Sequence, residues 1–191
     1  MENLINYNVN DIYGATFEDL LTENEVNDII KIFEKYKTVR GATLSDEASK
    51  SRRSDIAWIG NSDETLWIYN KITNAARSIN NELYNFDLVG AEPIQYTKYQ
   101  SSENGEYDWH KDTAMIGDNI RKLSIIILLS DKQEFSGGSF LISPEGGKPT
   151  EILMKKGRMI VFPSWIPHCV TPVLEGTRRS LVMWLYGKKF K

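Results

Sequence analysis

The sequence predicts a mostly β domain, of the sandwich or barrel type, with supporting helices near the N-terminus. Residues 87–187 contain many short apolar or alternating runs separated by turn signals such as Asn104-Gly105 and Glu175-Gly176, a pattern typical of these folds. Residues 1–86 contain two longer segments with apolar residues at helical spacing. A chain of 191 residues can bury a sizeable core as one domain. We therefore expect a single domain over 1–191, with a helical support region (1–86) and a β core (87–191).

Two helices are expected in the support region. Thr22 and Glu25 form a capping-box pattern ahead of an apolar stripe, which predicts a helix over Thr22–Lys37. A second apolar stripe predicts a helix over Asp63–Tyr84. Both stripes are expected to pack against the sheet.

The polar segment Gly41–Asp55, which carries Lys50, Arg52 and Arg53, has two interpretations. The favoured interpretation is a solvated loop. The alternative is a lid or a substrate-contacting segment over the site described below. The residues that follow, Ser54–Ile59, predict a short strand.

The β core is expected to contain seven segments, whose pairing the sequence leaves open. They are Leu88–Gln100, Leu123–Leu129, Gly138–Ile142, Glu151–Met154, Arg158–Phe162, Cys169–Val173 and Arg178–Tyr186.

Composition excludes several classes of function. The formal net charge is −3, so the chain has no overall basic field to attract nucleic acid. The single cysteine, Cys169, excludes an intramolecular disulfide and indicates a reducing compartment. We see neither a signal-peptide pattern nor an apolar run of the ~20 residues that a membrane helix needs. We expect a soluble cytoplasmic protein without membrane contact; the oligomeric state stays open.

The two histidines of the chain, His110 and His168, point to a metal site. If the chain around His110 is extended, His110 and Asp112 face the same side while Lys111 faces away. An H-x-D pattern occurs by chance in many proteins, but the residues before His168 read as an apolar strand and a proline-bounded loop that would deliver a second imidazole. Two imidazoles and a carboxylate form the facial triad that holds Fe(II) and leaves coordination positions open.

Arg178 and Ser180 suggest an anion site. On a strand they share one face, within the apolar run that continues to Leu185. A buried arginine needs a partner, and its planar guanidinium suits a carboxylate.

Together these residues resemble the Fe(II)/2-oxoglutarate-dependent dioxygenases, in particular the prolyl 4-hydroxylase-like branch with the PKHD-type hydroxylases. The similarity covers roughly residues 87–187 and includes Tyr99, the Tyr107-x-x-His110-x-Asp112 pattern, the segment Phe135–Phe140 and the Phe162-Pro163-Ser164 approach to His168. It implies a double-stranded β-helix, or jelly roll, with the N-terminal helices packed on the sheet.

The resemblance also implies the chemistry. His110, Asp112 and His168 would bind Fe(II), Arg178 and Ser180 would bind the distal carboxylate of the co-substrate 2-oxoglutarate, and Tyr99 would contact the co-substrate near the metal. O₂ would be consumed, 2-oxoglutarate would be decarboxylated to succinate and CO₂, and ascorbate would serve as reductant. A carboxylate at Asp112 favours hydroxylation, because halogenases of this superfamily have a small residue there.

Three further residues are expected near the substrate: Tyr107, Trp109 and Arg179. Trp109 should face away from His110 and could simply pack, and Arg179 should point away from Arg178 towards solvent or substrate. Trp184 is expected in the core.

Three functions are compared. The resemblance favours hydroxylation of a prolyl residue in a peptide or protein, with that peptide or protein as partner. The alternative is the same chemistry on a free amino acid, a small metabolite or a nucleobase; the second arginine typical of nucleic-acid demethylases is missing after Arg178. The remote alternative is a non-enzymatic jelly-roll binding module.

Overall fold

The structure is a computed structural model and describes residues 15–17, 19–41, 51–143 and 147–190. Its strands, with their bounds, are β1 Ala15–Phe17, β2 Val39–Arg40, β3 Arg52–Arg53, β4 Asp55–Ile59, β5 Gly90–Ala91, β6 Ile94–Gln100, β7 Glu106–His110, β8 Met115–Ile116, β9 Asn119–Leu128, β10 Phe135–Gly137, β11 Phe140–Ile142, β12 Thr150–Ile152, β13 Met159–Pro163, β14 His168–Val170 and β15 Val173–Lys188. The helices are α1 Glu23–Phe33 and α3 Leu66–Ile79; α3 continues into a π-helical turn, Asn80–Tyr84, and Ser101–Glu103 form one 3₁₀ turn. The prediction of a mostly β chain with supporting helices is confirmed.

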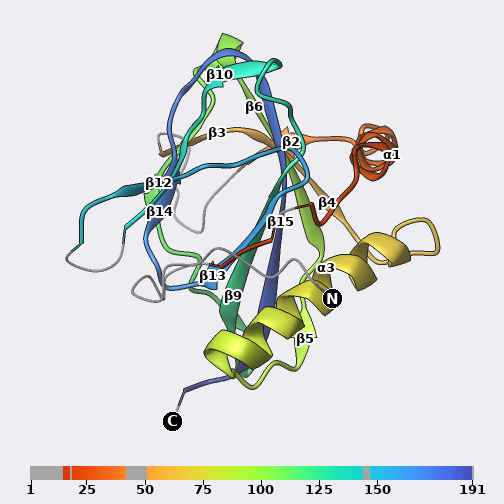
Figure 1. The fold of residues 1–191 in the computed structure, drawn as a ribbon, viewed down its shortest axis with the longest axis vertical. Helices are drawn as coiled ribbons and strands as arrows, with labels where there is room; N and C mark the ends of the chain where they lie inside the picture. Colours follow the sequence, from red (N-terminus) through yellow and green to blue (C-terminus); the bar gives the residue numbers. More distant parts are fainter. Residues whose placement is uncertain (1–14, 18, 42–50, 144–146, 191) are drawn as a thin grey trace.

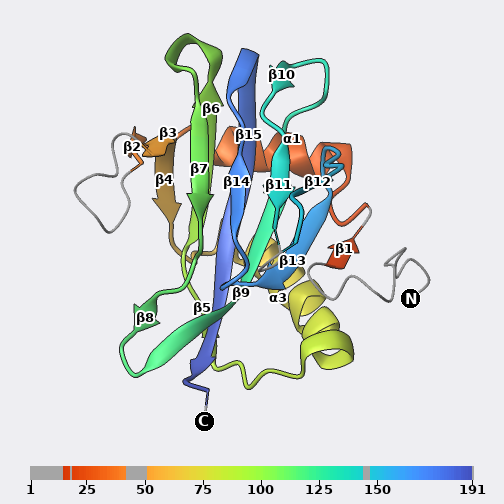
Figure 2. The ribbon, with the colours of Figure 1, turned by 90° about the vertical axis from the view of Figure 1, so that its left-hand side faces the viewer.

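Within the described residues the strands form two antiparallel sheets of ten and five strands. The larger sheet has the order β1-β13-β9-β15-β6-β4-β2, with β5 and β10 attached to β15 and β8 attached to β9. The smaller sheet has the order β12-β11-β14-β7-β3. Figure 1 shows the larger sheet in the middle, both helices on one side of it and the smaller sheet on the other; Figure 2 looks onto the smaller sheet.

Helix α1 forms where the capping box predicts. The Thr22 hydroxyl accepts a hydrogen bond from the Glu25 backbone N–H, and the Glu25 carboxylate accepts one from the Thr22 backbone N–H. These contacts satisfy N–H groups that have no partner within the helix. The helix ends at Phe33 rather than Lys37, and the second predicted helix is shortened to α3 and its π-helical turn, which stops at Asn85 in a left-handed conformation.

The outer face of the larger sheet and the two helices share one apolar core. Alternate residues of each strand point into it, for example Leu123, Ile125 and Ile127 of β9, while Val26, Ile29 and Phe33 of α1 approach from the other side. The two helices therefore pack on the sheet as predicted.

The inner face of the larger sheet packs against the smaller sheet in a second, smaller apolar cluster around Phe140, Ile160 and Phe162. The predicted segment Leu88–Gln100 is divided into β5 and β6, and the break contains Pro93, which has no N–H to give to a sheet. The other predicted strands form with ends shifted by a few residues, and β9 and β15 are extended. Among the described residues, no helix is long and apolar enough to cross a membrane.

The segment Gly41–Asp55 departs from its favoured interpretation. Residues 42–50, including Lys50, lie outside the described residues. Arg52 and Arg53 form β3, which pairs with β7 through the register Arg52–Tyr107, and only 6% of Arg52 is exposed. The solvated-loop interpretation is therefore wrong for Arg52, because pairing with β7 draws this side chain into the space between the sheets.

Candidate active site

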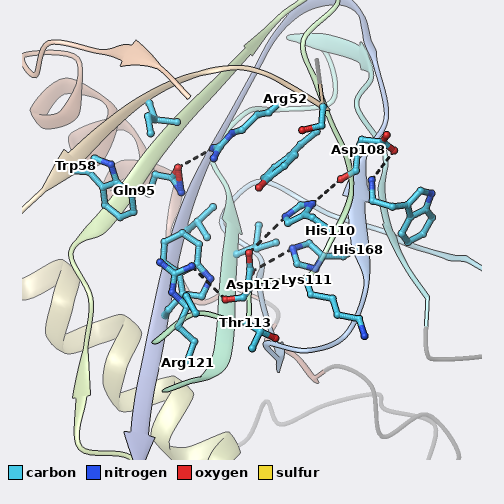
Figure 3. A pocket seen from close by; sticks show the side chains of 18 of the residues that line it. Arg52, Trp58, Gln95, Asp108, His110, Lys111, Asp112, Thr113, Arg121 and His168 are labelled. Atoms are coloured by element: carbon cyan, nitrogen blue, oxygen red, sulfur yellow. Dashed lines mark hydrogen bonds and ion pairs between the residues drawn. The ribbon is translucent and has the colours of Figure 1, made fainter. Parts of the chain in front are cut away.

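The structure brings His110, Asp112 and His168 together. β7 ends at His110 and β14 begins at His168, and these two residues lie opposite each other in the smaller sheet. The carboxylate of Asp112 lies 3.6 Å from Nε2 of His110 and 3.4 Å from Nε2 of His168. One ligand atom from each residue fits within a group no wider than 4.8 Å. Figure 3 shows the three side chains pointing at one another at the floor of a pocket.

The hydrogen bonds of the two imidazoles suit a metal ion. Nδ1 of His110 lies 2.7 Å from the Asp108 carbonyl oxygen, and Nδ1 of His168 lies 3.0 Å from the Ile166 carbonyl oxygen. Because a carbonyl can only accept, each Nδ1 carries the proton and each Nε2 presents a lone pair towards Asp112. Two such nitrogens and a carboxylate fit the ligand set of an Fe(II) facial triad.

Electrostatics favour the protonation states that bind a metal. Burial and, next, the neighbouring His168 lower the pKa of His110 to about 4. Burial alone would raise the pKa of Asp112, but the two imidazoles and the Ser124 hydroxyl outweigh burial and hold this pKa well below its usual range. Metal ligands must be neutral imidazole and ionised carboxylate, which is the state that these shifts support near neutral pH.

Ser124 orients the carboxylate. Its hydroxyl lies 2.7 Å from Oδ2 of Asp112 and 3.0 Å from Oγ of Ser164, while the Asp112 backbone N–H donates to the Ser164 carbonyl. Ser124 is fully buried on β9, whose neighbouring residues Leu123 and Ile125 belong to the apolar core. A hydrogen bond of this kind fixes the direction in which a ligand carboxylate points.

The triad opens into a cavity of about 1210 Å³. Tyr99, Tyr107 and Trp109 line it, as expected from the sequence. The ring of Tyr107 stacks on His110 with 3.5 Å between ring centroids and 13° between ring planes. Burial raises the pKa of Tyr107 to about 12, so its hydroxyl stays protonated near neutral pH. Trp109 stands exposed at the rim.

Arg178 and Ser180 lie together inside the protein, beside the triad's sheet. Only 1% of Arg178 is exposed; its Nη1 donates to Oγ of Ser180 at 3.3 Å, and its guanidinium carbon lies 5.6 Å from the centre of the Tyr99 ring. A side chain at Gly138 would collide with Arg178, since a Cβ atom there would lie 2.9 Å from Arg178 Cδ. This explains why a glycine of the Phe135–Phe140 segment lies here.

Buried polar atoms without partners gather on the same face. Three of them have no hydrogen-bond partner among the described residues: Thr97 Oγ1, Arg178 Nη2 and Trp184 Nε1. Thr97 lies directly opposite Ser180, and Tyr99 directly opposite Arg178, across β6 and β15. Burial lowers the pKa of Arg178 because it disfavours the charged form. Such unpartnered groups are costly unless a polar ligand satisfies them.

The structure corrects the placement of Arg179 near the substrate. Arg179 points to the helix side of the sheet, where it forms ion pairs with Glu34 of the α1 C-terminus at 3.5 Å and with Glu134 at 3.3 Å. It is not among the residues that line the cavity. Alternation along β15 explains this result, because neighbouring residues face opposite sides of a sheet.

Several pocket residues were not expected from the sequence. Among them are Arg40, Trp58, Gln95, Arg121 and Trp184, whereas Arg52 belongs to the segment for which the alternative interpretation is substrate contact. Trp184, expected in the core, is buried but forms part of the cavity wall, and the Arg121 guanidinium lies 3.9 Å above its ring. Strand alternation could have indicated two of them, because alternate residues of a strand share one face. Trp184 lies on the face of Arg178 and Ser180, and Gln95 lies on the face of Tyr99.

The fold and the triad define a class, a mostly β oxygenase-like domain with a facial-triad metal site. Residues 94–186, just under half of the chain, match the sequence model of the 2OG-Fe(II) oxygenase superfamily. The matched segment contains all three triad residues together with Tyr99, Arg178 and Ser180.

The relatives found by sequence include PKHD-type hydroxylases. One from Synechococcus sp. (strain CC9605) is 37% identical over 45% of this chain and 39% of its own length. PKHD-type hydroxylase YbiX of Escherichia coli (strain K12 / DH10B) is 32% identical over 47% of this chain and 41% of its own length. The matched segment thus spans about two fifths of the length of these relatives.

Solved structures share the fold over nearly the whole chain. A prolyl hydroxylase from Trichoplax adhaerens, in complex with a hypoxia inducible factor peptide fragment, has a TM-score of 0.76 at 19% identity and covers 93% of this chain and 85% of its own. A Pseudomonas putida prolyl-4-hydroxylase has a TM-score of 0.72 at 19% identity and covers 95% and 97%. The jelly-roll prediction is confirmed by this likeness.

Proposed function

We propose that this protein is an Fe(II)/2-oxoglutarate-dependent hydroxylase that acts on a prolyl residue in a peptide. The observation that carries the proposal is that one jelly-roll domain contains both the His110–Asp112–His168 triad and the buried Arg178, whose Nη2 has no partner among the described residues. The segment that holds these residues matches the model of the 2OG-Fe(II) oxygenase superfamily.

The triad residues would hold the metal through Nε2 of each histidine and the Asp112 carboxylate. Bound iron would supply the oxygen chemistry, which amino-acid side chains cannot perform. The protein supplies the orientation of these ligands. The Asp108 and Ile166 carbonyls set the imidazole tautomers, and Ser124 fixes the direction of the Asp112 carboxylate. Stacking on the Tyr107 ring restrains the plane of the His110 ring.

Arg178 would bind the distal carboxylate of 2-oxoglutarate. Its Nη2 lacks a partner among the described residues, and a carboxylate can accept two parallel hydrogen bonds from a guanidinium. Ser180 holds Nη1, and the unpartnered Thr97 hydroxyl opposite Ser180 offers a further donor. Tyr99 lies opposite Arg178 on the neighbouring strand, with its ring centre 5.6 Å from the Arg178 guanidinium carbon, and it lines the cavity.

Two features of the cavity support a peptide substrate. Its volume of about 1210 Å³ exceeds the roughly 300–1,000 Å³ of common small-molecule pockets. Four large apolar side chains that line it are also 42–55% exposed: Val39, Trp58, Trp109 and Met115. Exposed apolar groups gathered at one opening mark a contact surface for a partner with apolar side chains. The peptide in the Trichoplax complex is consistent with this choice.

The test is succinate formation from 2-oxoglutarate with Fe(II), O₂ and ascorbate, with and without end-blocked proline peptides, and with product masses measured in the same samples. We expect peptide-stimulated succinate together with the addition of one oxygen at proline. Omission of ascorbate tests its predicted role as reductant, and a chelator gives the metal-free control.

Other results would redirect the proposal. Succinate that no peptide stimulates would keep the oxygenase chemistry and move the substrate to a free amino acid, a metabolite or a nucleobase. No succinate from protein shown to hold iron would contradict the enzyme proposal.

A further inference from the structure

Arg52 is a buried cation in the cavity wall that lacks an acidic partner among the described residues. Its Nε donates to Ser54 Oγ at 2.8 Å and its Nη2 donates to Gln95 Oε1 at 2.8 Å, and both acceptors are neutral. No carboxylate of the described residues forms an ion pair with it. Figure 3 shows the guanidinium extending along the cavity towards Gln95. Burying an arginine without a counter-charge is unfavourable, so an anion bound at this position would stabilise it.

The other arginines of the cavity are already neutralised. Arg121 forms a two-pronged pair with Glu92, at 2.5 Å and 2.8 Å. Arg40 pairs with Glu103 and lies 3.8 Å from Asp55. Unlike these two arginines, Arg52 has no carboxylate partner among the described residues, so its charge is available to a ligand.

Arg52 lies close to the triad and apart from Arg178. Its guanidinium carbon is 4.6 Å from the centre of the Tyr107 ring, and the same ring stacks on the triad residue His110. Its partner Gln95 lies four residues along β6 from Tyr99, roughly 13 Å in a strand, and Tyr99 lies opposite Arg178. An anion on Arg52 is therefore a different group from the one expected on Arg178.

The remaining donors suit a carboxylate. Two contacts use only part of the five N–H groups of the guanidinium and leave those of Nη1. The amide oxygen of Gln95 is held by Arg52, and its NH₂ group makes no hydrogen bond with a described residue. Gln95 is buried in the cavity lining, and it lies opposite the exposed Trp58 across β4 and β6. A planar guanidinium beside an amide NH₂ matches the two oxygens of a carboxylate.

We infer that Arg52 and Gln95 form a subsite for a carboxylate of the substrate, so that the protein prefers acidic substrates. The carboxylate is an Asp or Glu side chain beside the modified residue, or a free C-terminal carboxylate. This inference rests on the proposed function, because it concerns the substrate of the same cavity.

The test is binding measured without turnover. Protein loaded with Fe(II) and 2-oxoglutarate under anaerobic conditions is titrated with matched probes, and the fluorescence of the cavity tryptophans Trp58, Trp109 and Trp184 is followed. The side-chain arm compares Ac-Ala-Glu-Pro-Ala-NH₂ and Ac-Ala-Pro-Glu-Ala-NH₂ with their glutamine counterparts. The free-carboxylate arm compares Ac-Ala-Pro-OH with Ac-Ala-Pro-NH₂.

Three variants assign the effect. Arg52→Gln removes the cation. Gln95→Glu keeps Arg52 but places a carboxylate beside its guanidinium. A loss of preference in this variant, when it is folded, would come from pairing of Arg52 with the new carboxylate rather than from unfolding. Arg53→Gln is the control, because Arg53 is the next residue of β3, pairs with Glu106 at 2.5 Å and does not line the cavity. Melting temperature and iron content are measured for each.

In the wild type, we expect the affinity for at least one acidic probe to be at least about tenfold higher than for its neutral counterpart. This is the effect of one charge-assisted pair. The preference should vanish in Arg52→Gln and in Gln95→Glu and persist in Arg53→Gln. Equal affinity for all matched probes, a preference that survives in Arg52→Gln, or no binding of any acidic probe overturns the inference.

The succinate assay on the same samples separates this result from the proposed function. Arg52-dependent binding without peptide-stimulated succinate would support the subsite and contradict the proposed hydroxylase activity. Peptide-stimulated succinate without a preference for acidic probes would support the hydroxylase activity and contradict the subsite.

Discussion

The two faces of the larger sheet are made by the same strands and have opposite characters. On β6, Ile94 and Tyr96 belong to the core beneath the helices, whereas Gln95, Thr97 and Tyr99 face the inside of the jelly roll. The same division holds on β9 and β15. One face is apolar and packed beneath the helices; the other combines a smaller apolar cluster with buried amides, hydroxyls and charges.

The difference teaches where stability and function lie in this fold. Burial of apolar area on the outer face stabilises the domain. Buried polar groups on the inner face lower stability unless a ligand satisfies them. Examples are the atoms of Thr97, Arg178 and Trp184 for which the described part of the chain supplies no hydrogen-bond partner. Substitutions on the two faces should therefore affect different quantities.

The largest effect is expected for Asp112→Ala on the inner face. Loss of one of three protein ligands should lower iron affinity by more than about a hundredfold, beyond the effect of losing an outer-shell partner, and abolish 2-oxoglutarate turnover. Iron content and succinate are measured, with Asp118→Ala, on an exposed turn, as control. Wild-type turnover by Asp112→Ala would remove this residue from the site.

Next in size is Ile125→Ala on the outer face. Ile125 is buried among the core residues of β9, and its truncation should lower the free energy of unfolding by about 2–5 kcal/mol. Urea denaturation measures this value. In the fraction that remains folded, the affinity for iron should stay near that of the wild type; a specific loss of iron affinity would break the division between the faces.

Arg178→Met should separate ligand binding from stability. The affinity for 2-oxoglutarate should fall about tenfold to a hundredfold, because a charge-assisted pair is lost, while iron binding is retained. The ligand-free protein should be no less stable than the wild type, since an incompletely paired buried cation is removed. Calorimetric titration and thermal melting test both statements, and an unchanged 2-oxoglutarate requirement would assign its carboxylate to another residue.

The effect expected for Ser124→Ala, one residue from Ile125 on β9, is no larger than that of Arg178→Met. The loss of its hydrogen bond to Asp112 should lower iron affinity about tenfold to a hundredfold, with a far smaller change in unfolding free energy than Ile125→Ala. The two neighbours thus form a matched pair. Equal destabilisation with unchanged iron affinity would show that Ser124 has only a packing role.

The sequence by itself determined the features that depend on local order. Alternation and helical spacing predicted the strands and both helices, because burial of one face imposes a period on the chain. Spacing also singled out His110, Asp112 and His168, which the structure brings together, and Arg178 with Ser180 on one strand face. The cytoplasmic location stays a prediction.

Only the tertiary structure decided which distant side chains share the cavity. Arg52 reads as part of a polar loop, and its burial depends on the pairing of β3 with β7 and on Gln95 from β6. Arg179 differs from Arg178 only by strand parity, and its partner Glu34 comes from the end of α1. Strand pairing is set by contacts between residues far apart in the chain, and a local pattern carries no record of which strands will meet.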